Sequence, residues 1–167
     1  YKPLTKQDLE TTILSILSRE QHDMLSTNKE LDFAFGYDNE TQKDMGRFRA
    51  NIYYERGHLS GAFRFLESSI RTVEELSLPK ILHNFANLKQ GFILVTGPTG
   101  HGKSTTLAAL IDEINHTRPD HIITIEDPIE YVFKSDKAII DQREVYQDTL
   151  SFARALRSTF RQDPDVI

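Results

Sequence analysis

A glycine-rich stretch at residues 97–106, GPTGHGKSTT, most constrains what this chain can fold into. The apolar run before it, residues 92–96, is typical of a strand, and the residues from Lys103 onward are typical of a helix. The spacing of Gly97, four residues, and then Gly102-Lys103-Ser104 matches in full the pattern of a loop that cradles phosphate. A strand, such a loop and a helix, in that order, indicate an α/β fold.

The residue types of this stretch suit phosphate binding on physical grounds. Glycines let successive backbone N–H groups turn toward one anion, and the following helix adds the partial positive charge of its N-terminus. Lys103 would reach the terminal phosphates of a nucleotide, and the Ser104 hydroxyl would hold Mg²⁺. The predicted binding residues are Gly97, Pro98, Thr99, Gly100, His101, Gly102, Lys103, Ser104 and Thr105. The alternative is an ordinary glycine-rich turn from a strand to a helix.

The section from Gly91 onward alternates short apolar runs with stretches of helical periodicity. The expected elements are a strand at 92–96, a helix at 103–115, strands at 121–126 and 139–140, a helix at 149–162 and a strand beginning at Val166. Pro79 is expected to open one more helix, with apolar residues up to Leu88. This alternation predicts a parallel sheet covered by helices.

The first 66 residues have a different pattern. Thr5 and Asp8 form the signature of a helix start, and apolar residues then recur at helical spacing up to Leu17. Alternating residues predict strands at 31–35, 46–55 and 59–66, with turns at Asp38-Asn39 and Gly57-His58. This section is therefore expected to be a small α+β unit with an antiparallel meander. The polar residues 67–78 are expected to form a linker.

Composition excludes several classes of function. The formal net charge of −5 gives no basic excess, so nucleic acid is not an expected partner. Three arginines of the last predicted helix share one face, which we interpret as a solvated or subunit-facing stripe: Arg154, Arg157 and Arg161. The absence of cysteine excludes thiolate metal sites, and the six histidines have no spacing typical of zinc ligands. No apolar stretch approaches the length of a membrane span, so direct membrane insertion is not expected.

The two ends of the sequence suggest that it belongs to a longer protein. It begins at Tyr1 rather than at a methionine, and an apolar run starts at Val166-Ile167 where the sequence stops.

Four segments together resemble the secretion and pilus motor ATPases: GFILVTGPTGHGKSTTLAALID, HIITIEDPIEYV, DQREV and FARALRSTFRQDPDVI. Two further segments, ELDFAFGY and GRFRANIYYERG, are similar to the twitching-motility, pilus-retraction branch of that family. The resemblance implies a P-loop NTPase with a RecA-like core. Residues 1–66 would be the C-terminal part of a PAS-like N-terminal domain, and residues 79–167 the first half of the core, ending before the Walker B strand.

The same resemblance implies an activity and partners. It predicts an ATPase that forms a homo-hexamer in the cytoplasm, peripheral at the inner face of the cytoplasmic membrane, and acts on an inner-membrane pilus platform protein. ATP with Mg²⁺ would be its substrate. The Glu that polarises the attacking water belongs to a motif expected after Val166, so we expect this chain alone to hydrolyse ATP negligibly.

The resemblance also assigns roles outside the glycine-rich loop. Glu126-Asp127-Pro128-Ile129-Glu130 matches the acidic box of the family, in which Glu130 would bind Mg²⁺; the alternative is a solvated acidic turn. Arg47, Arg49 and Arg56 would contact the γ-phosphate, and the alternative is a solvated strand face. Two residues depart from the family pattern, His101 in place of the usual Ser and Asp141 in place of the common Asn.

Other functions remain open at this level. A pilus-assembly or type II secretion ATPase would share most of these motifs. A nucleotide-binding oligomerisation module without hydrolysis would keep the phosphate loop and lack the water-activating Glu.

Overall fold

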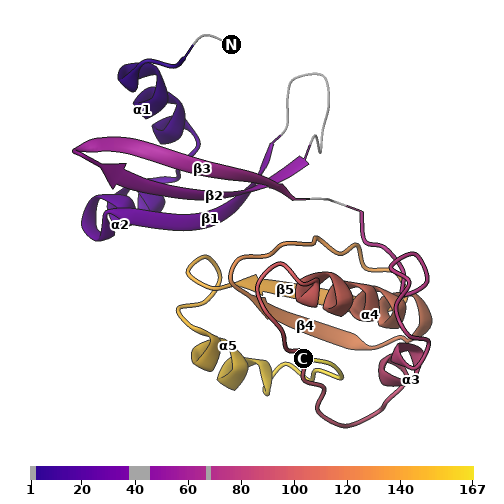
Figure 1. Ribbon diagram of the computed structural model, residues 1–167. Helices are drawn as coiled ribbons and strands as arrows, with labels where there is room; N and C mark the ends of the chain where they lie inside the picture. The colour runs from indigo at the N-terminus through magenta and orange to yellow at the C-terminus, as the bar shows by residue number, and fades with distance from the viewer. Residues whose placement is uncertain (1–2, 38–45, 67–68) are drawn as a thin grey trace. The chain divides into compact units, whose positions relative to one another are not determined.

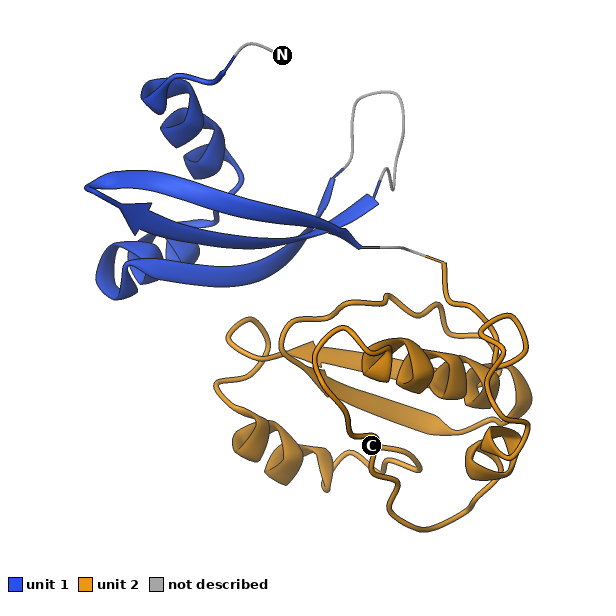
Figure 2. Cartoon of the chain, viewed as in Figure 1, with its two compact units in different colours: residues 1–66 blue, residues 67–167 orange. Residues whose placement is uncertain are grey.

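The computed structural model describes residues 3–37, 46–66 and 69–167. The chain divides into two compact units, residues 1–66 and 67–167 (Figure 2). The turn predicted at Asp38-Asn39 lies outside the described residues. Within them, no helix is long and apolar enough to cross a membrane.

Two capped helices open the first unit (Figure 1). Helix α1, Lys6–Ser15, begins as the sequence predicts, because the Thr5 hydroxyl accepts the Asp8 N–H at 3.1 Å and the Asp8 carboxylate accepts the Thr5 N–H at 3.2 Å. Helix α2, Arg19–Asn28, uses Ser18 and Gln21 in the same way and was not predicted. Its polar sequence carries little apolar periodicity, so only the capping signature could have indicated it.

Three antiparallel strands in the order β1-β2-β3 complete this unit: β1 at Glu30–Tyr37, β2 at Gly46–Glu55 and β3 at His58–Leu66. The turn between β2 and β3 consists of Arg56 and Gly57, since Glu55 pairs with His58. Both turn residues have positive φ, 51° and 80°. Such a two-residue turn matches the twist of the strands, and it displaces the predicted Gly57-His58 turn by one residue.

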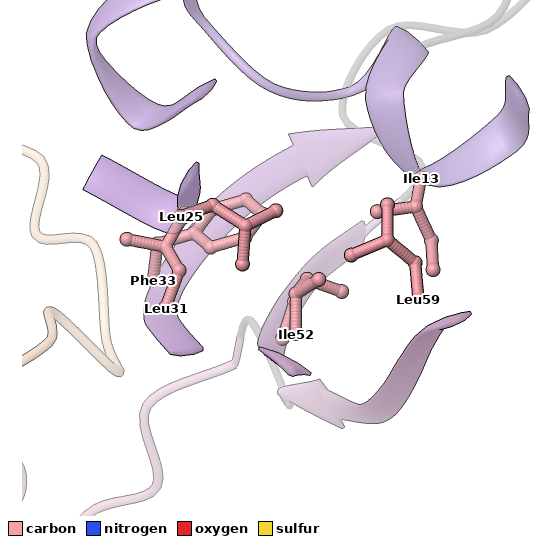
Figure 3. Packing of buried hydrophobic residues seen from close by; sticks show 7 residues of the cluster. Ile13, Leu25, Leu31, Phe33, Ile52 and Leu59 are labelled. Carbon is pink, nitrogen blue, oxygen red and sulfur yellow. The ribbon is translucent and has the colours of Figure 1, made fainter. Parts of the chain in front are cut away.

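The core of the first unit lies between the helices and one face of this sheet (Figure 3). Alternate strand positions point toward the helices, so Phe33 of β1 and Ile52 of β2 are buried together with Ile13 of α1 and Leu25 of α2. The intervening positions of β2, among them Arg47 and Arg49, lie on the opposite face, as the alternation predicts.

The second unit contains the predicted parallel pairing. Its elements are α3 at Leu82–Ala86, α4 at Lys103–Thr117, β4 at His121–Glu126, β5 at Ile139–Glu144 and α5 at Phe152–Thr159. Strands β4 and β5 are parallel, and Ile122 forms a further parallel bridge to Val166. Helix α4 packs on this sheet through a shared core in which Leu110, Ile114 and Ile122 are buried.

The prediction of a strand at residues 92–96 is wrong, because the structure has no strand there. The segment is irregular, and Phe92 has 88% of its surface exposed. A strand exists only where a neighbour pairs with it, and β4 pairs with β5 on one side and with Val166 on the other. Among the described residues, no strand therefore pairs with 92–96.

The residues expected to link the two sections also differ from the prediction. From Ser69 on they fold with the second unit, because Val73 is buried in its core and Leu76 and Leu78 pack against that core. The helix expected after Pro79 is only the five residues of α3. Helix α5 is shorter than predicted at both ends, because Ser151 caps its start and Phe160 is its C-cap residue.

Removal of a buried aromatic side chain tests the core of the first unit. Phe33 is 2% exposed, so we expect Phe33→Ala to lower the free energy of unfolding by about 3–5 kcal/mol in urea denaturation. The matched control is Phe65→Ala, because Phe65 is 59% exposed and its removal leaves no comparable cavity. Equal losses for the two variants would contradict this description of the core.

Candidate nucleotide-binding site

The predicted phosphate loop leads directly into α4. Gly102 is the N-cap residue of the helix and has a φ of 79°, a left-handed conformation that side chains other than glycine rarely adopt. A Cβ added there would meet nothing within 4 Å, so the need for glycine comes from the backbone rather than from space. This conformation lets the loop amides point toward a phosphate bound at the N-terminus of α4, where the helix dipole favours an anion.

The Lys103 side chain bends back over the loop. Its Nζ atom donates to the carbonyl oxygens of Gly97 at 2.9 Å and Pro98 at 2.8 Å. Two neutral carbonyl acceptors therefore hold the ammonium group against the loop. The ammonium can exchange them for a charged phosphate oxygen, which is a stronger acceptor. The exposed His101 also contacts the loop, with Nδ1 3.1 Å from the carbonyl oxygen of Thr99.

Ser104 and the acidic box line one cavity of about 570 Å³. Glu126, Asp127 and Glu130 contribute to its wall. Hydroxyl and carboxylate oxygens are the ligands that Mg²⁺ prefers, so these residues fit the predicted metal. Among the described residues, no group of three or more His, Asp or Glu side chains could hold a metal ion alone. Phosphate oxygens and water would complete the coordination of Mg²⁺ here.

Strand β5 holds the acidic box in place through two side chains that the sequence reasoning missed. Gln142 Nε2 donates to Glu126 Oε1 at 3.0 Å and to the Tyr131 carbonyl at 2.8 Å, and Gln142 Oε1 accepts the Phe133 N–H at 2.8 Å. Glu144, 5% exposed, accepts the Ile129 N–H at 3.0 Å. These bonds attach the box to β5 at Glu126 and Ile129, and they attach the residues after it at Tyr131 and Phe133.

A side-chain contact joins this box to α4. The hydroxyl oxygens of Thr105 and Tyr131 lie 3.0 Å apart. Thr105, a predicted nucleotide-binding residue, therefore contacts the residue that directly follows the acidic box. Nothing in the sequence spacing indicated this pair, because the two residues belong to separate segments.

The predicted arginines do not all lie together. Arg49 makes two bonds to Asp32 of β1, Nε to Oδ1 at 3.2 Å and Nη2 to Oδ2 at 2.7 Å. Arg64 of β3 lies opposite Arg49 in the strand register. Arg56 lies in the turn at the other end of β2, and a rise of roughly 3.3 Å per residue separates it from Arg47 by about 30 Å.

The far part of α4 is braced by two basic residues. The two ring nitrogens of His83 lie 2.9 Å from Glu113 of α4 and 2.8 Å from Glu74. The Glu113 hydrogen bond, with a smaller contribution from Glu74, raises the pKa of His83 above its ordinary value of 6.5. Arg118 donates to the carbonyl oxygens of Ala86 at 2.8 Å and Leu88 at 2.9 Å, which ties the end of α3 to the end of α4.

The His83 brace predicts a pH-dependent stability of the second unit. A histidine whose pKa is raised by folding stabilises fully below its unfolded pKa, here 6.5, and this contribution is lost as the pH rises through the folded pKa. We expect His83→Gln to lower the thermal unfolding midpoint more at about pH 6 than at about pH 9. His58→Gln, at the exposed start of β3, is the matched control. A His83→Gln effect independent of pH would contradict the charged pairing.

Comparison with known proteins agrees with this geometry. A twitching motility protein of Neisseria gonorrhoeae is 44% identical over 98% of this chain and 42% of the relative. The type IV pilus retraction ATPase PilT of Pseudomonas aeruginosa is 41% identical over 99% of this chain and 46% of the relative. The crystal structure of the pilus retraction motor PilT with bound ADP superimposes with a TM-score of 0.86 and 49% identity, over 93% of this chain and 44% of that one.

The chain therefore spans less than half the length of these relatives. The sequence profile of the type II/IV secretion system proteins matches residues 66–167, which is more than half of the chain. The parallel β4–β5 pairing and the loop before α4 agree with the RecA-like P-loop fold of secretion ATPases. This chain is a member of the type II/IV secretion system protein family.

Proposed function

We propose that this chain is the ATP-binding part of a motor ATPase that powers type IV pilus retraction and twitching motility. The observation that carries the proposal is the match of almost the whole chain, the first unit included, to a twitching motility protein and a pilus retraction ATPase. The phosphate loop, the bent Lys103 and the shared cavity of Ser104 and Glu130 support ATP as the ligand.

Each part of the site has a proposed role. The loop amides bind the phosphates, and the Lys103 ammonium exchanges its two carbonyl acceptors for phosphate oxygens. Ser104 and Glu130 hold Mg²⁺, which when bound neutralises the negative charge that develops on the phosphates. Arg47 and Arg49 contact the γ-phosphate, while Arg56 has a separate role because of its distance along β2.

In the intact protein, we propose a homo-hexamer in the cytoplasm, peripheral at the inner face of the cytoplasmic membrane. Its partner is an inner-membrane pilus platform protein. A role at the pilus is supported by the name of one relative, a type IV pilus retraction ATPase, while the hexamer and the platform partner are what the family resemblance implies. The rival functions are a pilus-assembly or type II secretion ATPase and a nucleotide-binding module without hydrolysis. A strain that lacks the gene separates the retraction motor from an assembly or secretion ATPase, since loss of a retraction motor leaves pili on the cell and abolishes twitching.

Replacement of the loop lysine tests nucleotide binding. We expect Lys103→Ala to abolish ATP binding in calorimetry, because the ammonium is the only charge that the loop itself offers to the phosphates. The fold should persist, since the Lys103 ammonium contacts only loop carbonyls in the bonds described. Lys137→Ala, at an exposed position, is the matched control. Undiminished ATP binding by Lys103→Ala would refute the phosphate-loop assignment.

Replacement of the two strand arginines tests their proposed contact. A charge-assisted bond to a phosphate oxygen is worth on the order of 1.5–3 kcal/mol, so Arg47→Ala and Arg49→Ala should each cut turnover of the intact protein at least about tenfold. ADP binding should barely change, because ADP lacks the γ-phosphate. Lys should substitute poorly, since it lacks the planar fork of two donors.

The matched control for both variants is Arg19→Ala at the start of α2, on a different element from the arginine face. Turnover within about twofold of wild type for Arg47→Ala and Arg49→Ala would support a solvated strand face instead.

A further inference from the structure

The acidic-box loop, residues 127–131, is attached to β5 at alternate backbone groups. Gln142 binds the backbone on both sides of Val132, through the carbonyl of Tyr131 and the amide of Phe133. Glu144, two positions later on the same face of β5, binds the amide of Ile129. The bonded groups of the loop are therefore spaced two residues apart, like the two side chains of β5 that hold them. Glu130 lies between two of these groups, the Ile129 amide and the Tyr131 carbonyl.

The same loop is attached to α4 by one side chain. The Tyr131 hydroxyl lies 3.0 Å from the Thr105 hydroxyl, which follows Ser104 in the first turn of the helix. Glu130, next to Tyr131, lines the cavity that Ser104 also lines. The two predicted Mg²⁺ ligands, Ser104 and Glu130, thus each directly precede a residue of the Thr105–Tyr131 hydrogen bond. This one bond joins the segments that carry the two ligands.

We propose that Gln142 and Tyr131 are positioning residues that set the place of Glu130 relative to Ser104 and so tune the affinity of the site for Mg²⁺. This inference rests on the function proposed above. Gln142 fixes the loop to the sheet, and Tyr131 fixes it to the helix that carries the phosphate loop. Mg²⁺ demands near-ideal octahedral geometry with short bonds, so a small displacement of one ligand weakens its binding. Residues that orient ligands in this way change metal affinity without touching the metal.

Two conservative substitutions remove these contacts. Tyr131→Phe deletes only the hydroxyl, and Gln142→Glu keeps the acceptor for Phe133 while it replaces the donor to Tyr131 and Glu126 by an acceptor. In the intact protein, we expect each to raise the Mg²⁺ concentration for half-maximal turnover about tenfold or more. Binding of ATP in the presence of EDTA, measured by calorimetry, should stay within about twofold of wild type. A general structural defect would weaken both quantities.

Matched controls exist nearby in the second unit. Tyr146→Phe removes a hydroxyl from a side chain that is 62% exposed, and Gln147→Glu adds a charge at an exposed position just after β5. Neither residue lines the cavity, so both variants should keep the wild-type Mg²⁺ requirement.

Two readouts do not depend on turnover. Hydrogen exchange in the protein without nucleotide should become faster at the amides of residues 129–133 in Gln142→Glu. The substitution removes the bond from Gln142 to the Tyr131 carbonyl and so weakens the attachment of this segment to β5. A double-mutant cycle of Tyr131→Phe with Thr105→Val tests the bond to α4. If the two hydroxyls act through their shared bond, the effects of the single variants on Mg²⁺-dependent ATP binding will not add.

The outcomes separate this inference from the function on which it rests. ATP binding by Lys103→Ala would refute the proposed function. If Lys103→Ala loses binding while Tyr131→Phe and Gln142→Glu keep the wild-type Mg²⁺ requirement, the positioning role alone is overturned. If Gln142→Glu fails to fold, Tyr131→Phe decides: additive effects with Thr105→Val overturn the role, and non-additive effects support it.

Discussion

The burial of α4 against the β4–β5 sheet is the interaction on which the candidate site depends. Leu110 and Ile114 of the helix are buried with Ile122 of β4, and this packing fixes the helix axis relative to the strands. The first turn of α4 and the end of β4 at Glu126 consequently line one cavity. Ligands of parallel α/β sheets bind at the carboxyl ends of the strands, where helix N-termini also point. Packing of apolar side chains thus decides where a phosphate and a metal can meet.

The two ends of α4 have separate tasks. At its N-terminus the loop turns on Gly102, Lys103 bonds to carbonyl oxygens of the loop, and Ser104 lines the same cavity as the acidic box. Toward its C-terminus, His83 pairs with Glu113 and Arg118 binds carbonyl oxygens at the end of α3. Cationic groups near a helix C-terminus also interact favourably with the helix dipole. The contacts of His83 and Arg118 therefore lie away from the end at which a nucleotide would bind, so they can be altered without touching the candidate site.

The sequence predicted those features that depend on local spacing. The loop at Gly97–Ser104, the capped start of α1 and strand β4 are all encoded within a few residues, and the parallel pairing followed from the alternation of elements. The missed features depend on residues distant in sequence. Gln142 and Tyr131 could be assigned only after β5 was placed beside β4, and residues 92–96 are apolar enough for a strand yet lie unpaired among the described residues.

The predicted phosphate-binding cations are held in place by acceptors that a phosphate can replace. Lys103 donates to two neutral carbonyl oxygens, which attract an ammonium less strongly than a phosphate does. Arg49 pairs with Asp32 through side chains that are 35% and 40% exposed, and ion pairs this accessible to water typically contribute only about 0–1 kcal/mol. The existing contacts fix the direction of each side chain and so reduce the entropy lost when an anion binds. Breaking these described contacts costs little stability, so it subtracts little from the binding energy of a phosphate that replaces them.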